Sequence, residues 1–277
     1  MGGSILRVVA SACPICDGSR SAAFSHRLLE RHEVDYLSCP DCGFLQTEPP
    51  YWLDEAYSRP IASTDVGLVM RNLANARLTA KLLVFGLPHE GPFLDAGGGY
   101  GLFTRLMRDR GFDFYWSDPH TENLFASGHE DVPSNVPYGA VTAYEVLEHL
   151  PDPLTWIRDV LARAGSSTLI FSQELFSGPP PPKDWWYYSF ETGQHISFYQ
   201  SKTLDVIARR LGLSRWCGGN GRLHVLSSHP VKERPMRRAS GRLAPLWEYR
   251  AMRARPSKLP DDYAQALRRI HSQPPAG

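Results

Sequence analysis

The chain has 277 residues, of which 42% are hydrophobic and 11% aromatic, which excludes a wholly disordered chain and allows one large domain with a smaller attachment. Its net charge of +1 divides into −6 for residues 1–231 and +7 for residues 232–277. No apolar run approaches 18 residues, so we expect no membrane span, and the first residues do not resemble a secretory signal.

Four of the five cysteines form two C-x2-C pairs, Cys13/Cys16 and Cys39/Cys42, separated by 22 residues. Two tight turns of this kind present four thiolates, which close a tetrahedron around zinc and leave no open position, so we expect a structural Zn²⁺ site. Five cysteines are too few for a disulfide framework, which favours a reducing compartment and predicts a cytoplasmic protein. We expect residues 1–55 to form a small, loop-rich zinc-binding module, and Cys217 to be buried as a small apolar residue.

Apolar stretches with strand and helix patterns alternate after this module. Helical spacing covers residues 66–86, and short apolar stretches alternate with further helices at 92–96, 102–111, 112–118, 140–150, 152–165 and 167–175. Strands that alternate with helices imply a parallel sheet with crossover helices. The sequence therefore predicts an α/β domain over residues 56–231.

A glycine-rich loop follows the first strand of this domain. Asp95 ends an apolar strand, and the loop that follows has the spacing G-x-G-x-G before a helix begins. Glycines allow a tight turn and a close approach of the backbone to a ligand. A carboxylate just before the loop would repel a phosphate and favours a cationic or amine-bearing ligand. Asp118 ends the second strand, where an acid can accept hydrogen bonds from both hydroxyls of a ribose.

The last part of the chain has weaker patterns. Residues 177–199 open with four prolines, carry many aromatic residues and are expected to form a functional loop or a linker. An amphipathic helix is predicted from Ser201, as its N-cap, to a stop at Gly212, followed by a strand over 223–229. Residues 232–277 are expected to form a basic, partly helical extension, with helices over 244–254 and 261–271.

At this point the sequence resembles the class I S-adenosylmethionine-dependent methyltransferases. The resemblance is carried by DAGGGYG, Asp118, YEVLEHLPDP and STLIFSQEL, over roughly residues 70–225. It implies a Rossmann-like, seven-stranded, mainly parallel sheet with flanking helices, preceded by a small zinc-ribbon-like module. It also implies S-adenosylmethionine as cofactor and a cofactor site made of Asp95, Ala96, Gly97, Gly99, Gly101, Asp118, Pro119 and Glu145.

A second resemblance concerns the catalytic residues. The segment QHISFYQSKTL is similar to one in bacterial sugar C-methyltransferases, in which a zinc-binding module precedes the same core and the histidine of the segment is the proposed base. This implies His195 as base, with Tyr188 and His149 beside it, because a histidine can take a proton near pH 7. Gln194 stands where that family has Glu.

Three functions fit these observations. The first is methyl transfer to a small molecule such as a nucleotide-linked sugar or glycan precursor. The second is methylation of an rRNA or tRNA base, because RNA methyltransferases also carry zinc fingers and the +7 extension could meet phosphates. The net-acidic body favours the small molecule over nucleic acid. The third, a non-catalytic cofactor-binding interaction module, is disfavoured by the intact glycine loop. The oligomeric state is left open.

Overall fold

The computed structural model describes residues 12–58, 65–87, 90–131, 136–218, 221–239, 245–246, 249 and 253–272. They belong to two compact units, each assembled from distant parts of the chain. Unit 1 comprises Met1–Asp65, Ala143–Arg163 and Leu169–Ser228, and unit 2 comprises Val66–Thr142, Ala164–Thr168 and His229–Gly277. The expected domain boundaries, 1–55, 56–231 and 232–277, are not these, and they stay a prediction about independently folding parts.

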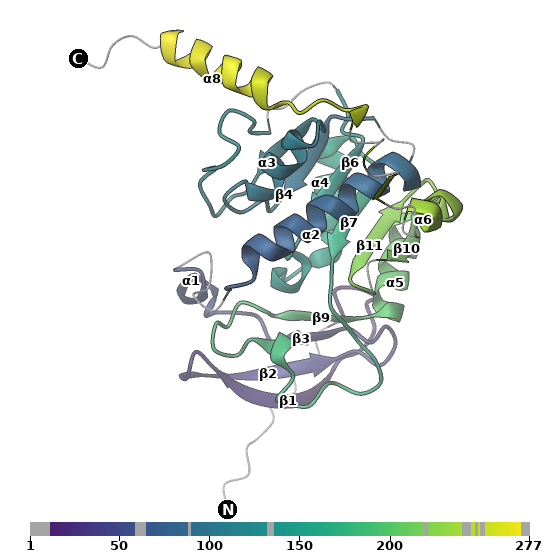
Figure 1. Cartoon of the computed structure of the whole chain (residues 1–277). Helices are drawn as coiled ribbons and strands as arrows, with labels where there is room; N and C mark the ends of the chain where they lie inside the picture. Colours follow the sequence, from purple (N-terminus) through teal and green to yellow (C-terminus); the bar gives the residue numbers. More distant parts are fainter. Residues whose placement is uncertain are drawn as a thin grey trace, which may run out of the picture. The chain divides into compact units, whose positions relative to one another are not determined.

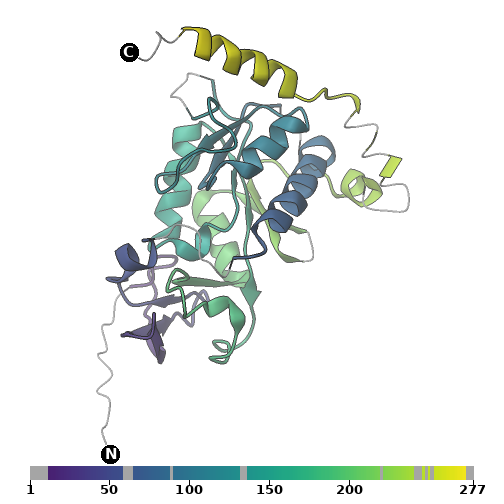
Figure 2. The same ribbon diagram turned by 60° about the vertical axis from the view of Figure 1, so that its left-hand side comes forward.

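The N-terminal part of unit 1 is rich in strands rather than loops, which corrects the sequence expectation. Its five-stranded sheet has the order β1-β2-β3-β9-β8 (Figure 1). The pairs β1/β2, β2/β3 and β3/β9 are antiparallel, and β8/β9 is parallel. The strands are β1 (Ser21–Leu28), β2 (His32–Ser38), β3 (Leu45–Thr47), β8 (Leu175–Phe176) and β9 (Ser197–Gln200). The chain therefore joins its N-terminal hairpin, shown in purple in Figures 1 and 2, to segments about 150 residues later.

The core of unit 1 explains this long-range pairing. On β2, Val34 and Tyr36 alternate with more exposed neighbours and point to the same side. They pack with aromatic side chains from the segment that the sequence predicted as a loop, including Tyr188 and Phe198. Segment 177–199 is thus part of a hydrophobic core, and burial of several aromatic rings stabilises the strand pairing.

Six strands within the described part of the chain form the second sheet, in the order β10-β11-β7-β6-β4-β5. The strands are β4 (Phe93–Ala96), β5 (Phe114–Ser117), β6 (Ala140–Ala143), β7 (Thr168–Ser172), β10 (Ser214–Gly218) and β11 (Leu223–Ser227). The pairs β4/β5 and β4/β6 are parallel, and β10/β11 is antiparallel. The Rossmann-like α/β fold class is confirmed, with six described strands where the sequence predicted seven.

Most helices agree with the predicted positions, whereas the short helices Leu53–Ala56 and Glu233–Ala239 were not predicted. The helices are α1 (Leu53–Ala56), α2 (Leu68–Lys81) with a π-helical turn η1 (Leu82–Gly86), α3 (Leu102–Asp109), α4 (Pro153–Ala164), α5 (Ser201–Leu211), α6 (Glu233–Ala239) and α8 (Leu259–Ser272), and the short 3-10 turns η2 (Leu147–His149) and η3 (Trp186–Tyr188). The N-cap of α5 is Gln200 rather than Ser201, because the side chains of Gln200 and Thr203 form a reciprocal capping box. Gly212 ends this helix in the left-handed conformation, as predicted.

The described part of the C-terminal extension contains two helices, α6 and α8, and the non-helical residues 254–258. The predicted helix over residues 261–271 corresponds to α8, the yellow helix of Figure 2. Most of the other predicted helical stretch, residues 244–254, lies outside the described residues. No helix in the described ranges is long and apolar enough to span a bilayer.

Candidate functional site

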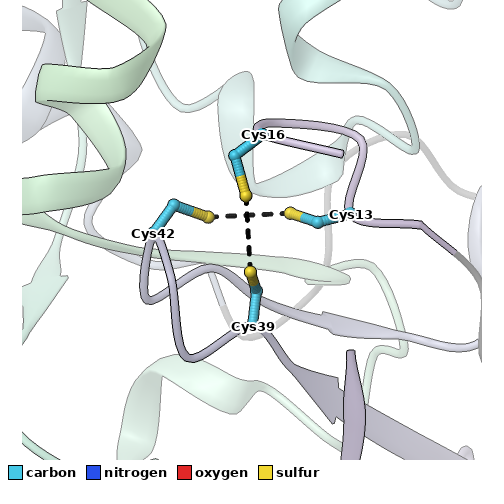
Figure 3. Close-up of side chains that lie close together, drawn as sticks. All are labelled: Cys13, Cys16, Cys39 and Cys42. Carbon is cyan, nitrogen blue, oxygen red and sulfur yellow. Dashed lines mark hydrogen bonds between the residues drawn. The ribbon is translucent and has the colours of Figure 1, made fainter. Parts of the chain in front are cut away.

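The four paired cysteines converge on one point in unit 1 (Figure 3). The Sγ atoms of Cys13 and Cys42 are 3.6 Å apart, those of Cys16 and Cys39 are 3.4 Å apart, and all four lie within 4.8 Å of one another. Sulfur ligands at about 2.3 Å from a tetrahedral zinc ion stand roughly 3.8 Å from each other. The donor set and its spacing therefore fit a tetrahedral metal ion with four thiolate ligands.

Backbone hydrogen bonds shape both cysteine turns. The amides of Asp17 and Gly43 donate to the carbonyls of Cys13 and Cys39 at 2.9 and 2.8 Å. Gly43 has a φ of +73°, and a Cβ there would collide with the Gln200 side chain, so the second turn requires glycine. The two turns thus set the positions of the four sulfur atoms.

Helix α5 fastens the second cysteine turn to the rest of unit 1. The Thr203 hydroxyl donates to the carbonyl of Cys42 at 2.8 Å, and Lys202 Nζ donates to the carbonyl of Pro40 at 2.8 Å. Arg210 forms an ion pair with Asp17 in the first turn. Both cysteine turns are therefore attached to α5.

The fifth cysteine, Cys217, is exposed, so its predicted burial is wrong. It lies on β10, the terminal strand in the order of its sheet, where alternate side chains face solvent. Periodicity over so short a strand gave no indication of which face is covered.

Asp95 is the first element of the cofactor site in unit 2. It lies on β4 with 2% of its surface exposed, and the hydroxyls of Thr142 and Thr104 donate to its two oxygens at 2.9 and 3.0 Å. Burial raises the pKa of this carboxyl to about 7, against the opposing effect of the two hydroxyls. Asp95 can therefore change its charge near neutral pH when a cationic group approaches.

The glycine loop is closed onto Asp118, which follows β5. The residues Gly97, Gly99 and Gly101 have φ values of 70°, 53° and 84°, and Gly97 N donates to the carbonyl of Ser117 at 2.8 Å. The amide of Gly99 donates to Oδ2 of Asp118 at 2.9 Å. A Cβ added to Gly99 would meet no atom within 4 Å, so this peptide faces open space. At Gly99 the backbone of the loop is therefore accessible, and it lies beside the carboxylate of Asp118.

The other predicted cofactor residues have different environments. Ala96 is buried at the end of β4, and Pro119 is exposed after Asp118. Glu145 belongs to unit 1, where its Oε1 accepts a hydrogen bond of 2.6 Å from the Ser172 hydroxyl and its φ is 56°. A non-glycine residue in this conformation is strained, which is common at functional sites. The sequence missed Thr104 and Thr142, because hydroxyl residues at buried strand and helix positions have no distinctive pattern.

Unit 1 contains a second polar cluster, formed by Glu148, His149 and His195. One ligand-type atom from each of these residues lies within 4.8 Å of the others, and the two imidazole rings are 5.0 Å apart. The predicted histidines are therefore brought together, although 46 residues separate them in the sequence.

Hydrogen bonds fix the tautomer of both histidines. Nδ1 of His149 lies 3.0 Å from the carbonyl oxygen of Gln194, and Nδ1 of His195 lies 2.7 Å from that of Tyr187. A carbonyl only accepts, so each Nδ1 carries the proton and each neutral ring has its lone pair on Nε2. Burial lowers the pKa of both histidines, which keeps both rings neutral at pH 7.

Glu148 is buried in this cluster with 1% exposure. Its Oε1 accepts a hydrogen bond of 2.9 Å from the Tyr187 hydroxyl, whereas Oε2 is buried without a partner. Burial, followed by the charge of Glu145, raises the pKa of Glu148 to about 7. The resemblance carried by YEVLEHLPDP already implied that Glu148, with Glu145 and His149, lines the cofactor and substrate edge.

Tyr188, the predicted catalytic tyrosine, lies in a different environment. Its ring is fully buried against Tyr36, Phe190 and Phe198, and its hydroxyl donates to the carbonyl of Pro181 at 3.0 Å. The tyrosine that reaches the cluster is Tyr187. The two tyrosines have different environments because they are consecutive residues of η3, where consecutive side chains point in different directions.

Comparison with known proteins identifies the family. The profile of the family described as "Methyltransferase domain" matches residues 70–217, more than half of the chain. The chain belongs to this methyltransferase family. The comparison with curated proteins gave no match.

Solved structures similar to this methyltransferase include TnmH, with 16% identity over 65% of this chain and 62% of that chain and a TM-score of 0.45. The mitomycin 7-O-methyltransferase MmcR shares 16% identity over 63% of this chain and 59% of that chain, with a TM-score of 0.45. Human N-acetylserotonin methyltransferase in complex with SAM shares 13% identity over 64% and 65%, with a TM-score of 0.42. The methyltransferase spans about three fifths of the length of the first two, and likeness of this degree carries no argument about the acceptor.

Proposed function

We propose that this methyltransferase moves a methyl group from S-adenosylmethionine to a small-molecule acceptor of the sugar-nucleotide or glycan-precursor class. The observation that carries the proposal is the glycine loop of unit 2, with Gly99 bonded to Asp118 and Asp95 buried at its start. This loop lies inside the range matched by the methyltransferase family, residues 70–217.

The residues of the loop suit the chemical groups of this donor. The donor has an ammonium group and a sulfonium, so carboxylates near it are favourable where they would repel a phosphate. We assign the methionine end to the loop of Gly97, Gly99 and Gly101, and the ribose hydroxyls to Asp118. When bound, S-adenosylmethionine supplies an electrophilic methyl group, and the open backbone at Gly99 permits close approach.

We assign the acceptor to the cluster of Glu148, His149 and His195 in unit 1. A hydroxyl acceptor must lose a proton as it is methylated, and the neutral His195 has an unprotonated Nε2 that can take it. We assign to Tyr187 the catalytic role that the sequence predicted for Tyr188, because the Tyr187 hydroxyl donates a hydrogen bond to Glu148. A cluster of carboxyl, imidazole and phenol groups suits an acceptor rich in hydroxyls.

We assign a structural Zn²⁺ to the four cysteines. Four thiolates fill a tetrahedron, so the ion has no position for a substrate, and its role is to hold the strand-rich module against α5. The zinc content of the purified chain tests this assignment, with one ion per chain expected.

Calorimetry with S-adenosylmethionine tests the donor assignment. Asp118→Ala is expected to weaken binding by about 10-fold or more, since the substitution removes a charged hydrogen-bond acceptor worth about 1.5–3 kcal/mol. Asp109→Asn, at the end of α3 in the same unit, is the matched control and should bind as the native chain does. Mass spectrometry of candidate hydroxyl acceptors incubated with the donor should show the added methyl group. Equal donor affinity in the native chain and Asp118→Ala would overturn the donor site.

A further inference from the structure

We propose that Glu148, His149 and His195 form a second metal site, which binds one divalent transition-metal ion through a carboxylate oxygen and two imidazole nitrogens. The ligand-type atoms of the three residues already lie within 4.8 Å of one another. Ligands about 2.1 Å from a shared ion stand roughly 3 Å apart, so modest side-chain rotations bring the three into coordination.

The hydrogen bonds of the two histidines orient their rings as in metal-ligating histidines. In each ring Nδ1 donates to a backbone carbonyl, that of Gln194 for His149 and that of Tyr187 for His195. This is the arrangement that orients metal-ligating histidines and increases the basicity of the other nitrogen. Each ring is thereby left with a lone pair on Nε2.

The carboxylate supplies a second, independent indication. Glu148 is 99% buried, and the Tyr187 hydroxyl donates to its Oε1. Its Oε2 has no hydrogen-bond partner among the described residues. An unsatisfied buried polar atom costs about 1–3 kcal/mol, and more when it is charged. A cation at the cluster would satisfy this oxygen.

The ligand types indicate which ions fit. Two imidazoles with one carboxylate suit Mn²⁺, Fe²⁺, Co²⁺ or Zn²⁺, whereas Mg²⁺ and Ca²⁺ prefer oxygen ligands alone. Three protein ligands also leave positions open, unlike the four cysteines. If the proposed function holds, on which this step rests, an acceptor hydroxyl would occupy an open position and become more acidic. The ion would then activate the hydroxyl in place of His195, whose Nε2 is engaged as a ligand, and the proton would pass to solvent.

Titration of the zinc-loaded chain with Mn²⁺ tests the site without donor or acceptor. The electron paramagnetic resonance signal of free Mn²⁺ reports the amount bound, and Mn²⁺ does not displace zinc from thiolates because it binds such sites more weakly. We expect one Mn²⁺ per chain, with affinity reduced about 10-fold or more in Glu148→Gln and His195→Gln. His32→Gln is the matched control, because His32 also contacts a glutamate, Glu55, at 2.9 Å but belongs to no three-ligand cluster in the described part of the chain.

Two checks keep the result interpretable. Glu148→Gln is nearly isosteric and removes a buried charge, and retention of one zinc per chain in each variant shows that unit 1 is folded. Absence of bound Mn²⁺, or equal affinity in Glu148→Gln and the native chain, would overturn the site. Such a result leaves methyl transfer untouched, whereas failure to bind S-adenosylmethionine would remove the proposed function and leave the Mn²⁺ site standing.

Discussion

Two adjacent residues of the same type have different roles that the sequence could not distinguish. Tyr187 and Tyr188 are indistinguishable by composition or motif, yet one bonds to Glu148 and the other to a backbone carbonyl in an aromatic core. The direction of each side chain depends on the single turn η3, whose position is set by packing on β2 and β9 rather than by local pattern. His149 and His195 could be predicted as a pair because each lies in a motif.

Phenylalanine substitutions separate the two tyrosines. Tyr187→Phe leaves both Glu148 oxygens without a tyrosine donor and is expected to lower the rate of methyl transfer about 10- to 100-fold. Tyr188→Phe removes one hydrogen bond to Pro181 and should cost about 1 kcal/mol of unfolding free energy while retaining the rate. Turnover and denaturant unfolding of both variants check this pair, and a greater loss of rate in Tyr188→Phe would contradict it.

We expect the buried carboxylate of Asp95 to lower the free energy of unfolding while it increases the affinity for S-adenosylmethionine. Its folded pKa of about 7 lies above the unfolded value of 3.8, so the native chain loses stability as pH rises from about 4 to 7 and the cost is full above that range. Asp95→Asn is therefore expected to raise the unfolding free energy, by about 2–3 kcal/mol more at pH 8 than at pH 5, because one pKa unit corresponds to about 1.4 kcal/mol.

The same substitution should weaken S-adenosylmethionine binding at pH 8, where the native carboxylate is charged. Denaturant unfolding at the two pH values and calorimetry at pH 8 measure both effects. A stability change that is equal at pH 5 and pH 8 would show that the carboxyl of Asp95 does not titrate in this range.

At the scale of elements, the sequence predicted local structure better than strand pairing. The helices, the strand before Asp95 and the strand before Asp118 follow from periodicity and glycine positions. The pairing of β3 with β9 joins Leu45 to Phe198, and no local signal links positions so far apart. The loop-rich interpretation of residues 1–50 failed because short strands such as Leu45–Thr47 need partners from elsewhere in the chain.

The connection between the cysteine turns and α5 leads to a prediction about zinc. Cys39→Ser should bind less than one zinc per chain and lower the melting temperature, because the metal supplies folding free energy to its site. The turn loses the ion that braces it, whereas the glycine loop belongs to unit 2, so S-adenosylmethionine affinity is expected to change less than 3-fold. Zinc analysis, thermal unfolding and calorimetry check the three effects, with the exposed Cys217→Ser as control. Full zinc content in Cys39→Ser would contradict the four-thiolate site.

For the whole chain, the charge divides at residue 232 into an acidic part and a basic extension, but an acidic residue of the extension makes one of its contacts. The extension carries +7, yet one of its buried attachments is made by an acid, Asp262 of α8, which accepts two hydrogen bonds from Arg108 at 2.7 and 2.9 Å and one from Arg105 at 2.8 Å. The basic residues Arg253 and Arg255 line a cavity of about 520 Å³ in unit 2. The sequence predicted a basic extension but could not show that one of its acids pairs with arginines of α3.

Asp262 therefore predicts how the extension contributes to stability. Burial alone would raise the pKa of this carboxyl, but the hydrogen bonds from Arg108 and Arg105 lower it to about 2, below the ordinary 3.8. The pair stabilises the folded chain above about pH 4, and this contribution is lost as pH falls toward 2. Asp262→Asn removes one of the two carboxylates that pair with Arg108 and leaves Asp113, whose Oδ1 lies 2.9 Å from Nη1 of Arg108. We therefore expect a loss of about 1.5–3 kcal/mol of unfolding free energy at pH 7, and a smaller loss below pH 4. Asp261→Asn, at the exposed neighbouring position, is the control, and unfolding curves that coincide for the two variants at pH 7 would show that the extension is held by other contacts.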